Sequence, residues 1–334
     1  SIAINAAGGF LMAQDPKTAK FDGMPASVIG TGLVDAILQA EELPDRLLSH
    51  INNTPPEPLI RKQSENELPM TDDDAYIGIM QILLQVVGID FHDYKQATIV
   101  RRIERRMQVR HLTKLEKYLR LLKDEKQEIF SLKRELLIPV TNFFRDPETF
   151  EKVESSIVKK IVTDTPTGSS IRVWIAGVST GEEAYSIAML FLEAFEKLRR
   201  WPNLKIFATD VSQESIDTAA SGNYSDATAT EITQERLERF FSQSGNSYTV
   251  KPELRQTIVF AKHNLLSDPP FTHMDLVSCR NTLIYFTQDA QKKALQRLQF
   301  AIKPEGHLIL GSSESLPSND TVSYTHLRAH ETAT

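Results

Sequence analysis

The sequence has little that would tie it to an oxidising compartment, a membrane or a nucleic acid. It contains one cysteine, Cys279, so no disulfide forms within the chain and a reducing compartment, the cytoplasm, is expected. No apolar run is long enough to cross a membrane, and the first residues lack the basic start and apolar core of a signal peptide. The net charge of −6 argues against wholesale binding to nucleic acid or to membrane surfaces.

Composition divides the 334 residues into regions. Residues 1–50 contain too little apolar sequence to bury a core alone. Residues 51–75 are rich in proline and acidic residues, which is typical of a linker. Residues 76–140 follow a helical pattern, with no glycine after Gly88 and no proline before Pro139.

A segment of the helical region, residues 95–110, carries arginines beside an apolar stripe. On a helix, Ile99, Ile103 and Met107 share one face. The arginines on the opposite side and its flank are Arg101, Arg102, Arg105 and Arg106. They form either a solvated face or a docking surface for an acidic partner. No aromatic residues interleave them for base stacking, so stable nucleic-acid binding is not expected.

From residue 141 to about 320, short apolar runs alternate with amphipathic helical patterns. The strand-like runs are IRVWIAG, LKIFATD, TIVFAKHNL, MDLVSCRN and GHLILGSS. This alternation predicts an α/β fold with a doubly wound, mostly parallel sheet. Ligands of such sheets bind at the carboxyl ends of the strands, and the polar residues of interest fall there.

The first strand end is a loop with Gly177 and Gly181, and a helix begins at Glu182 and Glu183. The glycines allow a sharp turn and the close approach of a ligand. A phosphate-binding Walker loop would need a lysine here, and there is none. The two carboxylates occupy the place that an anion would take at a helix start. The loop is therefore either a tight turn closed by capping acids or a site for a cationic or neutral ligand group.

Three further strand ends add groups that suit a nucleoside. Asp210 is placed to accept both hydroxyls of a ribose, although an aspartate there could also cap a helix. Asn264 can hydrogen-bond an adenine edge, and Arg280 and Asn281 end another strand. Cys279 has no paired histidine for a nucleophilic mechanism and is expected to be core. A nucleoside with a cationic group and no phosphate describes S-adenosylmethionine.

Six blocks between residues 76 and 316 resemble, in order, the chemotaxis receptor methyltransferase family CheR. They are TNFFRDPETF, AGVSTGEEAYSIAM, FATDVSQESIDTAASGNY, HNLLSDPPF, DLVSCRNTLIYF and IKPEGHLILGSSESL. The resemblance implies a class I S-adenosylmethionine-dependent methyltransferase domain at 141–320, preceded by an all-helical domain at 76–140. It also implies a small antiparallel β-subdomain inserted at 222–258.

The resemblance implies an O-methyltransferase that converts glutamate side chains of chemoreceptors to methyl esters, with S-adenosylhomocysteine as the second product. It further implies that the basic helix 95–110 docks on the receptor helices. A glutamate carboxylate is already a nucleophile at neutral pH, so catalysis would consist mostly of alignment. The candidates for steering the substrate carboxylate are Arg145 first, then Arg280 and Tyr285.

The resemblance also implies which residues contact the cofactor, and no metal ligand is among them. The expected cofactor-binding residues are Thr141, Arg145, Gly177, Gly181, Glu182, Asp210, Asn264, Leu265, Arg280 and Asn281. Two other functions stay open. One is a methyltransferase with a different acceptor, and the other is a non-catalytic signalling module that binds S-adenosylmethionine.

The two ends of the chain differ from this pattern. Residues 1–50 resemble the last part of a CheB methylesterase domain, so the resemblance implies an esterase–methyltransferase hybrid of which only an inert remnant is present here. Residues 321–334 bear no likeness to the family and are expected to be a non-native or disordered tail.

Overall fold

The computed structural model describes residues 11–30, 34, 36–52, 71–137, 139–166, 168–226, 230–312, 314 and 325–327. Its internal contacts divide the chain into two units, Ser1–Val140 and Thr141–Thr334. Each unit is described by itself. Most of the expected linker, from 53 to 70, lies outside the described residues.

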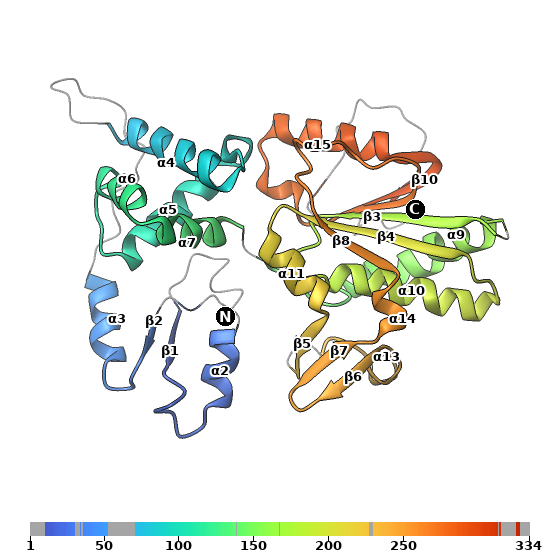
Figure 1. The fold of residues 1–334 in the computed structure, drawn as a ribbon, viewed down its shortest axis with the longest axis horizontal. Helices are drawn as coiled ribbons and strands as arrows, with labels where there is room; N and C mark the ends of the chain where they lie inside the picture. Colours follow the sequence, from blue (N-terminus) through green and yellow to red (C-terminus); the bar gives the residue numbers. More distant parts are fainter. Residues whose placement is uncertain are drawn as a thin grey trace. The chain divides into compact units, whose positions relative to one another are not determined.

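The N-terminal piece of the first unit is a small α/β arrangement (Figure 1). Its strands β1 (Met12–Gln14) and β2 (Ala36–Leu38) pair in parallel. Its helices are α2 (Gly23–Gly30) and α3 (Leu43–Asn52). This is the part of the expected remnant at 1–50 that the structure describes.

The rest of the first unit is helical, as predicted. Its elements are α4 (Asp72–Val87), the short 3-10 helix η1 (Phe91–Asp93), α5 (Gln96–Val109), α6 (Leu115–Asp124) and α7 (Lys126–Leu136). Helix α4 begins with a reciprocal capping box between Thr71 and Asp74 and ends at Gly88, whose φ of 74° suits a glycine. The apolar stripe predicted on α5 is buried, since Ile99, Ile103 and Met107 are at most 1% exposed.

The second unit is built on a six-stranded sheet with the order β11-β10-β9-β3-β4-β8. The strands are β3 (Ser170–Ala176), β4 (Asn203–Asp210), β8 (Ile258–Lys262), β9 (Met274–Cys279), β10 (Ile302–Leu310) and β11 (Thr325–Leu327). Every neighbouring pair is parallel. The chain runs outward from β3 to β8 and then returns to β9 on the other side of β3, so the direction of winding reverses between β3 and β9. The predicted doubly wound sheet is confirmed.

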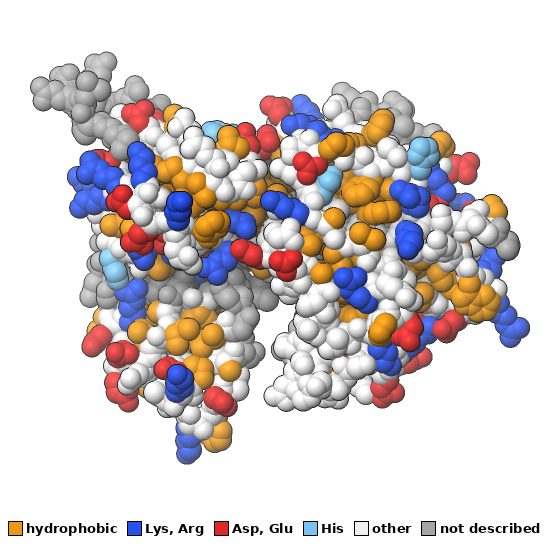
Figure 2. All heavy atoms as spheres, viewed as in Figure 1, with side chains coloured by type: hydrophobic (Ala, Val, Ile, Leu, Met, Phe, Trp, Pro, Cys, Tyr) orange, Lys and Arg blue, Asp and Glu red, His pale blue; other side chains and the backbone are white. Residues whose placement is uncertain are grey.

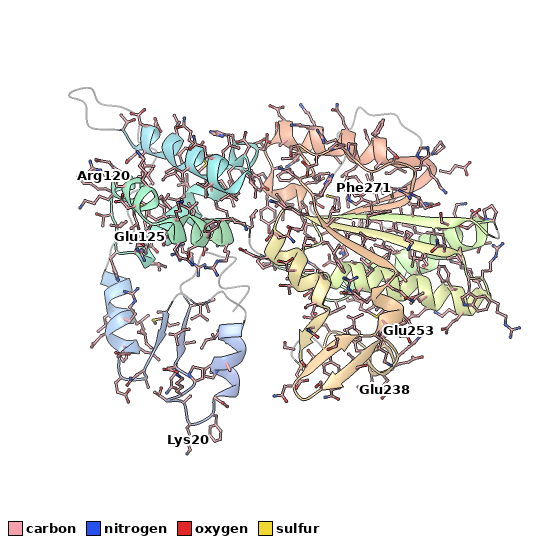
Figure 3. All side chains as sticks on the ribbon, in the orientation of Figure 1. Lys20, Arg120, Glu125, Glu238, Glu253 and Phe271 are labelled. Carbon is pink, nitrogen blue, oxygen red and sulfur yellow. The ribbon has the colours of Figure 1, made fainter. Side chains whose placement is uncertain are left out.

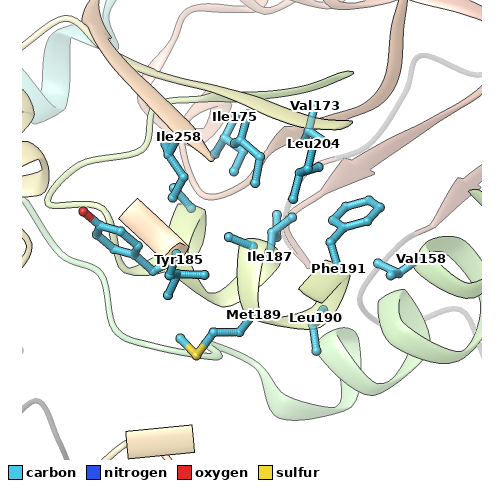
Figure 4. Close-up of a cluster of buried hydrophobic side chains, with 14 of the residues drawn as sticks. Val158, Val173, Ile175, Tyr185, Ile187, Met189, Leu190, Phe191, Leu204 and Ile258 are labelled. Atoms are coloured by element: carbon cyan, nitrogen blue, oxygen red, sulfur yellow. The ribbon is translucent and has the colours of Figure 1, made fainter. Parts of the chain in front are cut away.

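Helices cover both faces of this sheet, and Figure 1 shows α10 and α15 on opposite sides of it. The helical elements are α8 (Pro147–Lys152), the π-helical turn η2 (Val153–Val158), α9 (Lys159–Asp164), α10 (Glu182–Leu198), α11 (Gln213–Ser221), α14 (Pro252–Arg255), η3 (Leu283–Tyr285) and α15 (Gln288–Ala301). The close-up in Figure 4 shows Val173 and Ile175 of β3 and Leu204 of β4 beside Ile187 and Phe191 of α10. Alternate residues of the strands therefore form one core with α10.

The other face of the sheet carries an aromatic cluster. The ring of Phe271, labelled in Figure 3, lies 5.1 Å from that of Trp174 and 5.0 Å from that of Phe207. Phe271 belongs to the loop between β8 and β9, which contains no helix. The buried indole N–H of Trp174 donates to Thr209 Oγ1 at 2.9 Å, which satisfies its polar atom.

The predicted antiparallel insertion is also present. Strands β5 (Asn223–Ser225), β6 (Phe241–Ser244) and β7 (Ser247–Val250) form a three-stranded sheet with β7 in the middle, next to α13 (Gln234–Phe240). Of the expected tail at 321–334, the structure describes residues 325–327, which form β11 beside β10. The other residues of that tail lie outside the described ones.

Candidate active site

Eight of the ten residues expected to bind the cofactor lie at one edge of the sheet, because the carboxyl ends of parallel strands share an edge; Thr141 and Arg145 instead precede α8. Gly177, Gly181 and Glu182 follow β3, and Asp210 ends β4. Asn264 and Leu265 follow β8, and Arg280 and Asn281 follow β9. The reversal of winding between β3 and β9 falls within this group, which is where open α/β sheets place their ligands.

Both glycines of the first loop are required by neighbouring chain segments. Gly177 has a φ of 77°, and a Cβ there would lie 2.1 Å from Thr282 Oγ1 in the loop after β9. Gly181 has a φ of 101°, and a Cβ there would lie 2.8 Å from the Cβ of Ala219 and 3.0 Å from the hydroxyl of Tyr224. Only glycine fits both the backbone conformation and these contacts. The loop is thus held close to β9 and to the inserted subdomain.

Asp210 joins the ends of β3 and β4. Its Oδ2 accepts from the Ser179 N–H and its Oδ1 from the Ser212 N–H, both at 2.9 Å. Burial raises the pKa of this carboxyl, and the backbone hydrogen bonds oppose that shift. The cap of the following helix is Ser212, whose hydroxyl accepts from the Ser215 N–H. The alternative that Asp210 caps this helix is therefore wrong.

The structure separates the two glutamates that begin α10. Glu182 is 7% exposed and accepts hydrogen bonds from the Thr180 hydroxyl at 2.7 and 3.0 Å. Burial raises the pKa of Glu182 to about 7, although the Thr180 hydrogen bond works in the opposite direction. Glu183 instead accepts from Ser278 Oγ at 2.5 Å and lies 3.4 Å from Nη1 of Arg280. Glu182 is thus a buried carboxylate with no cationic partner among the contacts described here, and a positively charged ligand group would suit it.

A strained turn carries Arg145. Phe144 and Asp146 on either side of it have φ values of 49° and 61°, in the left-handed region that disfavours residues with a side chain. Arg145 and Thr141 are half-buried. Tyr285, the last of the expected catalytic residues, lies in η3 and is 36% exposed.

Two unpartnered polar atoms support a ligand at this edge of the sheet. Ser179 Oγ and Asn281 Oδ1 are buried without a hydrogen-bond partner in the structure. Both residues also have positive φ values, 52° and 56°. Buried polar atoms are normally paired, so these two mark places for polar groups of a ligand. With the carboxylates of Glu182 and Asp210, they provide a donor and acceptor set that fits a nucleoside with a cationic group and no phosphate.

Sequence reasoning missed Ser179 and Glu314. The Glu314 carboxylate lies beyond the end of β10 and accepts four backbone N–H groups. They belong to Asn281, Thr282, Leu283 and Gly311, at 2.7 to 3.0 Å. Glu314 therefore fixes the loop after β9, including Asn281. The sequence did contain an indication of Glu314, because an acidic residue follows the predicted strand directly in the block GSSES.

The basic helix of the first unit differs from the predicted solvated face. Arg102 and Arg105 are only 7% and 4% exposed, and both pair with Glu135 of α7 at 3.2 and 3.4 Å. Arg106 forms two 2.9 Å hydrogen bonds with Glu128 of α7. Arg101 is exposed. The interpretation as a solvated face is therefore wrong for Arg102 and Arg105, because α7 covers them and supplies their counter-charges.

Family models match most of the chain. The "CheR methyltransferase, SAM binding domain" matches residues 139–331, and the "CheR methyltransferase, all-alpha domain" matches residues 74–137. The chain belongs to the CheR methyltransferase family. A model of the "CheB methylesterase" matches residues 2–47. S-adenosylmethionine is therefore the cofactor of this chain, in agreement with the polar groups at the strand ends.

Known relatives of this CheR chain fall into two groups by length. A 104.1 kDa protein of Rhodobacter capsulatus is 47% identical over 94% of this chain, which spans only 35% of that protein. The chemotaxis protein methyltransferase of Escherichia coli is 32% identical, over 73% of this chain and 85% of its own length. That of Listeria monocytogenes is 30% identical, over 72% of this chain and 90% of its own length.

Solved structures match about half of the CheR chain. They include a DhpI complex (TM-score 0.29, 14% identity, 48% of this chain and 50% of that one) and the N-methyltransferase NodS of Bradyrhizobium japonicum (TM-score 0.28, 15% identity, 48% and 61%). With TM-scores this low, they add nothing to the assignment.

Within the described part of this CheR chain, no helix has the length and apolar character needed to span a membrane. No cluster of three or more histidine, cysteine, aspartate or glutamate side chains there could hold a metal ion. Figure 2 shows acidic and basic side chains interspersed on the face in view.

Proposed function

We propose that this chain transfers the methyl group of S-adenosylmethionine to a glutamate side chain of a chemoreceptor. The products are a glutamate methyl ester and S-adenosylhomocysteine. The observation that carries the proposal is the family match, which includes relatives named chemotaxis protein methyltransferase that this chain covers over 85–90% of their length. The buried, acid-lined strand ends support it, because they suit a cationic nucleoside.

The cofactor would be held by the strand ends described above. The Asp210 carboxylate accepts backbone N–H groups at both oxygens and would also accept a ribose hydroxyl. Glu182 lies next to the loop and would pair with the positive charge of the cofactor. Ser179 and Asn281 offer their unpartnered atoms, and Asn264 with Leu265 would contact the adenosine side.

Catalysis of this reaction requires alignment of the reactants more than it requires proton transfer. S-adenosylmethionine supplies an activated methyl group, and the substrate carboxylate attacks without a general base. We propose that Arg145 steers this carboxylate into line and that Tyr285 contributes to its orientation. A well-aligned, water-poor site accounts for a large rate enhancement in such a reaction.

Receptor docking is assigned to α5 through Arg101. Arg102, Arg105 and Arg106 are engaged with α7, so Arg101 is the exposed arginine of the four. Acidic receptor helices would meet its charge at the surface.

The function is tested with methyl-labelled S-adenosylmethionine and a receptor cytoplasmic fragment. Alkali should release the label from the fragment as methanol, because glutamate methyl esters are hydrolysed by base. A fragment whose methylation-site glutamates are replaced by alanine serves as the control and should stay unlabelled. Cofactor binding without transfer to any acceptor would identify a signalling module instead, and alkali-stable label or label on another acceptor would identify a different methyltransferase.

A further inference from the structure

Arg280 is buried among protein groups that use its guanidinium. The side chain is 2% exposed. Its Nη2 donates to the carbonyl of Arg145 and to Oδ2 of Asp146, each at 2.8 Å. Its guanidinium also lies over the ring of Phe150, 5.2 Å from the centroid. Nε of Arg280 has no hydrogen-bond partner, but a substrate carboxylate could reach the guanidinium only if the groups that bury it moved.

The main chain that Arg280 contacts is strained, and residues outside the turn hold it by hydrogen bonds. Phe144 and Asp146 have positive φ values, which are unfavourable for residues with a Cβ. The Phe144 N–H donates to Ser186 Oγ at 3.1 Å, and Arg280 binds the next carbonyl along the chain, that of Arg145. The conformation of the turn, and hence the direction of the Arg145 side chain, depends on these contacts.

Glu183 fixes Arg280 in turn. Its Oε2 lies 3.4 Å from Nη1 of Arg280, and its Oε1 accepts from Ser278 Oγ at 2.5 Å. Glu183 stands in the first turn of α10 and Ser278 stands in β9, so both belong to regular elements. The carboxylates of Glu183 and Asp146 balance the buried guanidinium charge.

We propose that Glu183 and Arg280 are positioning residues for the methyl transfer. Glu183 orients the guanidinium of Arg280, and Arg280 holds the turn so that Arg145 meets the substrate carboxylate. The inference rests on the proposed function and gives Arg280 a role through Arg145 in place of direct contact with the substrate. Misplacement of a reacting group by about 1 Å costs on the order of 100-fold in rate, so the effect is measurable.

The first test is Glu183→Gln, which keeps the size of the side chain but replaces one acceptor oxygen by an amide. The expected result is a fall in kcat of about 10- to 100-fold, with the receptor KM and the cofactor Kd changed less than about threefold. Glu196→Gln is the matched control, because Glu196 lies on the same helix and pairs with Arg239 at the surface. Wild-type kcat in Glu183→Gln would overturn the proposal.

The second test is Arg280→Lys, which keeps the charge but cannot form the same set of hydrogen bonds. If Arg280 contacted the substrate directly, kcat would fall in Arg280→Lys with no change in hydrogen exchange of the main chain at residues 142–147. The proposal expects the fall in kcat together with exchange in that turn about tenfold faster than in the wild type. The double variant Glu183→Gln/Arg280→Lys should have a kcat no lower than that of Arg280→Lys alone, because Glu183 acts on the turn only through Arg280. Losses in kcat that add in the double variant would contradict the proposal.

A third measurement needs no methyl acceptor. Hydrogen exchange of the main chain at residues 142–147 in the full chain should be about tenfold faster in Glu183→Gln and unchanged in Glu196→Gln. Equal exchange in the wild type and Glu183→Gln would overturn the inference. Absence of label on the receptor fragment with wild-type protein would instead contradict the proposed function, so the two failures are distinguishable.

Discussion

The two units of this CheR chain differ in how completely their buried polar groups are paired. In the helical unit, Arg102 and Arg105 share Glu135, and Arg106 has Glu128. At the strand ends of the second unit, Ser179 Oγ and Asn281 Oδ1 are buried without partners. All the buried side-chain atoms without a partner that the described residues contain lie in the second unit.

This difference in pairing distinguishes buried polar groups that stabilise the fold from those that are available to a ligand. Charges that are paired inside one unit keep that unit folded and have little left to offer to a ligand. Unpaired polar atoms and backbone strain, as at Ser179 and Asn281, lower stability, and under the proposed function the cofactor would supply the missing partners of these two residues. The five predictions below would break or sharpen this comparison.

The largest effect is expected in the helical unit. Glu128 is 3% exposed and accepts two hydrogen bonds from Arg106 and one from the Tyr118 hydroxyl. Glu128→Ala leaves these donors buried and should lower the free energy of unfolding by about 3–5 kcal/mol. The matched control is Glu116→Ala, which removes a surface pair with Arg120 and should cost at most about 0.5 kcal/mol.

Chemical denaturation followed by circular dichroism measures both changes. An equal loss of unfolding free energy in the two variants would mean that the buried pair of Glu128 stabilises the protein no more than a surface pair does. The contrast between the two units would then disappear.

The next effect is on catalysis. Arg145→Ala removes the group proposed to steer the substrate carboxylate, so kcat should fall by about 100-fold or more. The melting temperature should stay near that of the wild type, because Arg145 is half-buried and its carbonyl contact with Arg280 remains. Turnover near the wild-type value in a receptor methylation assay would refute the role of Arg145.

Much of the sheet and of its ligand-binding edge could be predicted from sequence. The apolar runs that became β3, β4, β8 and β9 end at the glycine loop, Asp210, Asn264 and Arg280, and parallel strands bring their carboxyl ends together. The residue types at these strand ends indicated S-adenosylmethionine, and the family resemblance implied the same cofactor. Strand patterns carry this information because they fix both the end and the direction of each strand.

The partners of charged side chains could not be predicted in this way. Helical periodicity gave the face of Arg102 and Arg106 but not what covers that face, and their partners Glu135 and Glu128 are 33 and 22 residues away in the chain. The same limit applied to Glu182 and Glu183, which are adjacent and differ only in what packs against them. Only tertiary packing decides such pairings.

A smaller effect concerns pH. Burial raises the pKa of Glu182 to about 7, and a cationic cofactor favours the ionised form. Cofactor affinity should therefore be constant above about pH 7 and fall by about tenfold per pH unit below it, because binding then requires loss of a proton. Glu182→Gln should bind more weakly and with no such slope. Titration calorimetry from about pH 5.5 to about pH 8.5 measures both, and a wild-type affinity that does not vary would exclude Glu182 as the partner of the positive charge.

The same carboxyl makes a prediction for stability without cofactor. Its pKa in the folded state lies above the ordinary value of 4.5, so its stabilising contribution is present below pH 4.5 and is lost as the pH rises through 7. Glu182→Gln does not titrate. The cofactor-free variant should therefore be more stable than the wild type at about pH 8, and the difference should shrink as the pH falls.

The smallest effect is expected at the surface of α5. Arg101 is exposed, so Arg101→Ala should change the free energy of unfolding by less than about 0.5 kcal/mol. The loss of one surface charge should raise the receptor KM by about threefold and leave kcat unchanged, and added salt should erase the difference. Arg105→Ala, on the same helix, should instead destabilise the helical unit because Glu135 loses a buried partner. Receptor affinity that depends on Arg105 but not on Arg101 at equal stability would show that the buried arginines bind the receptor after all. The division between buried, paired charges for stability and an exposed charge for binding would then fail in the helical unit.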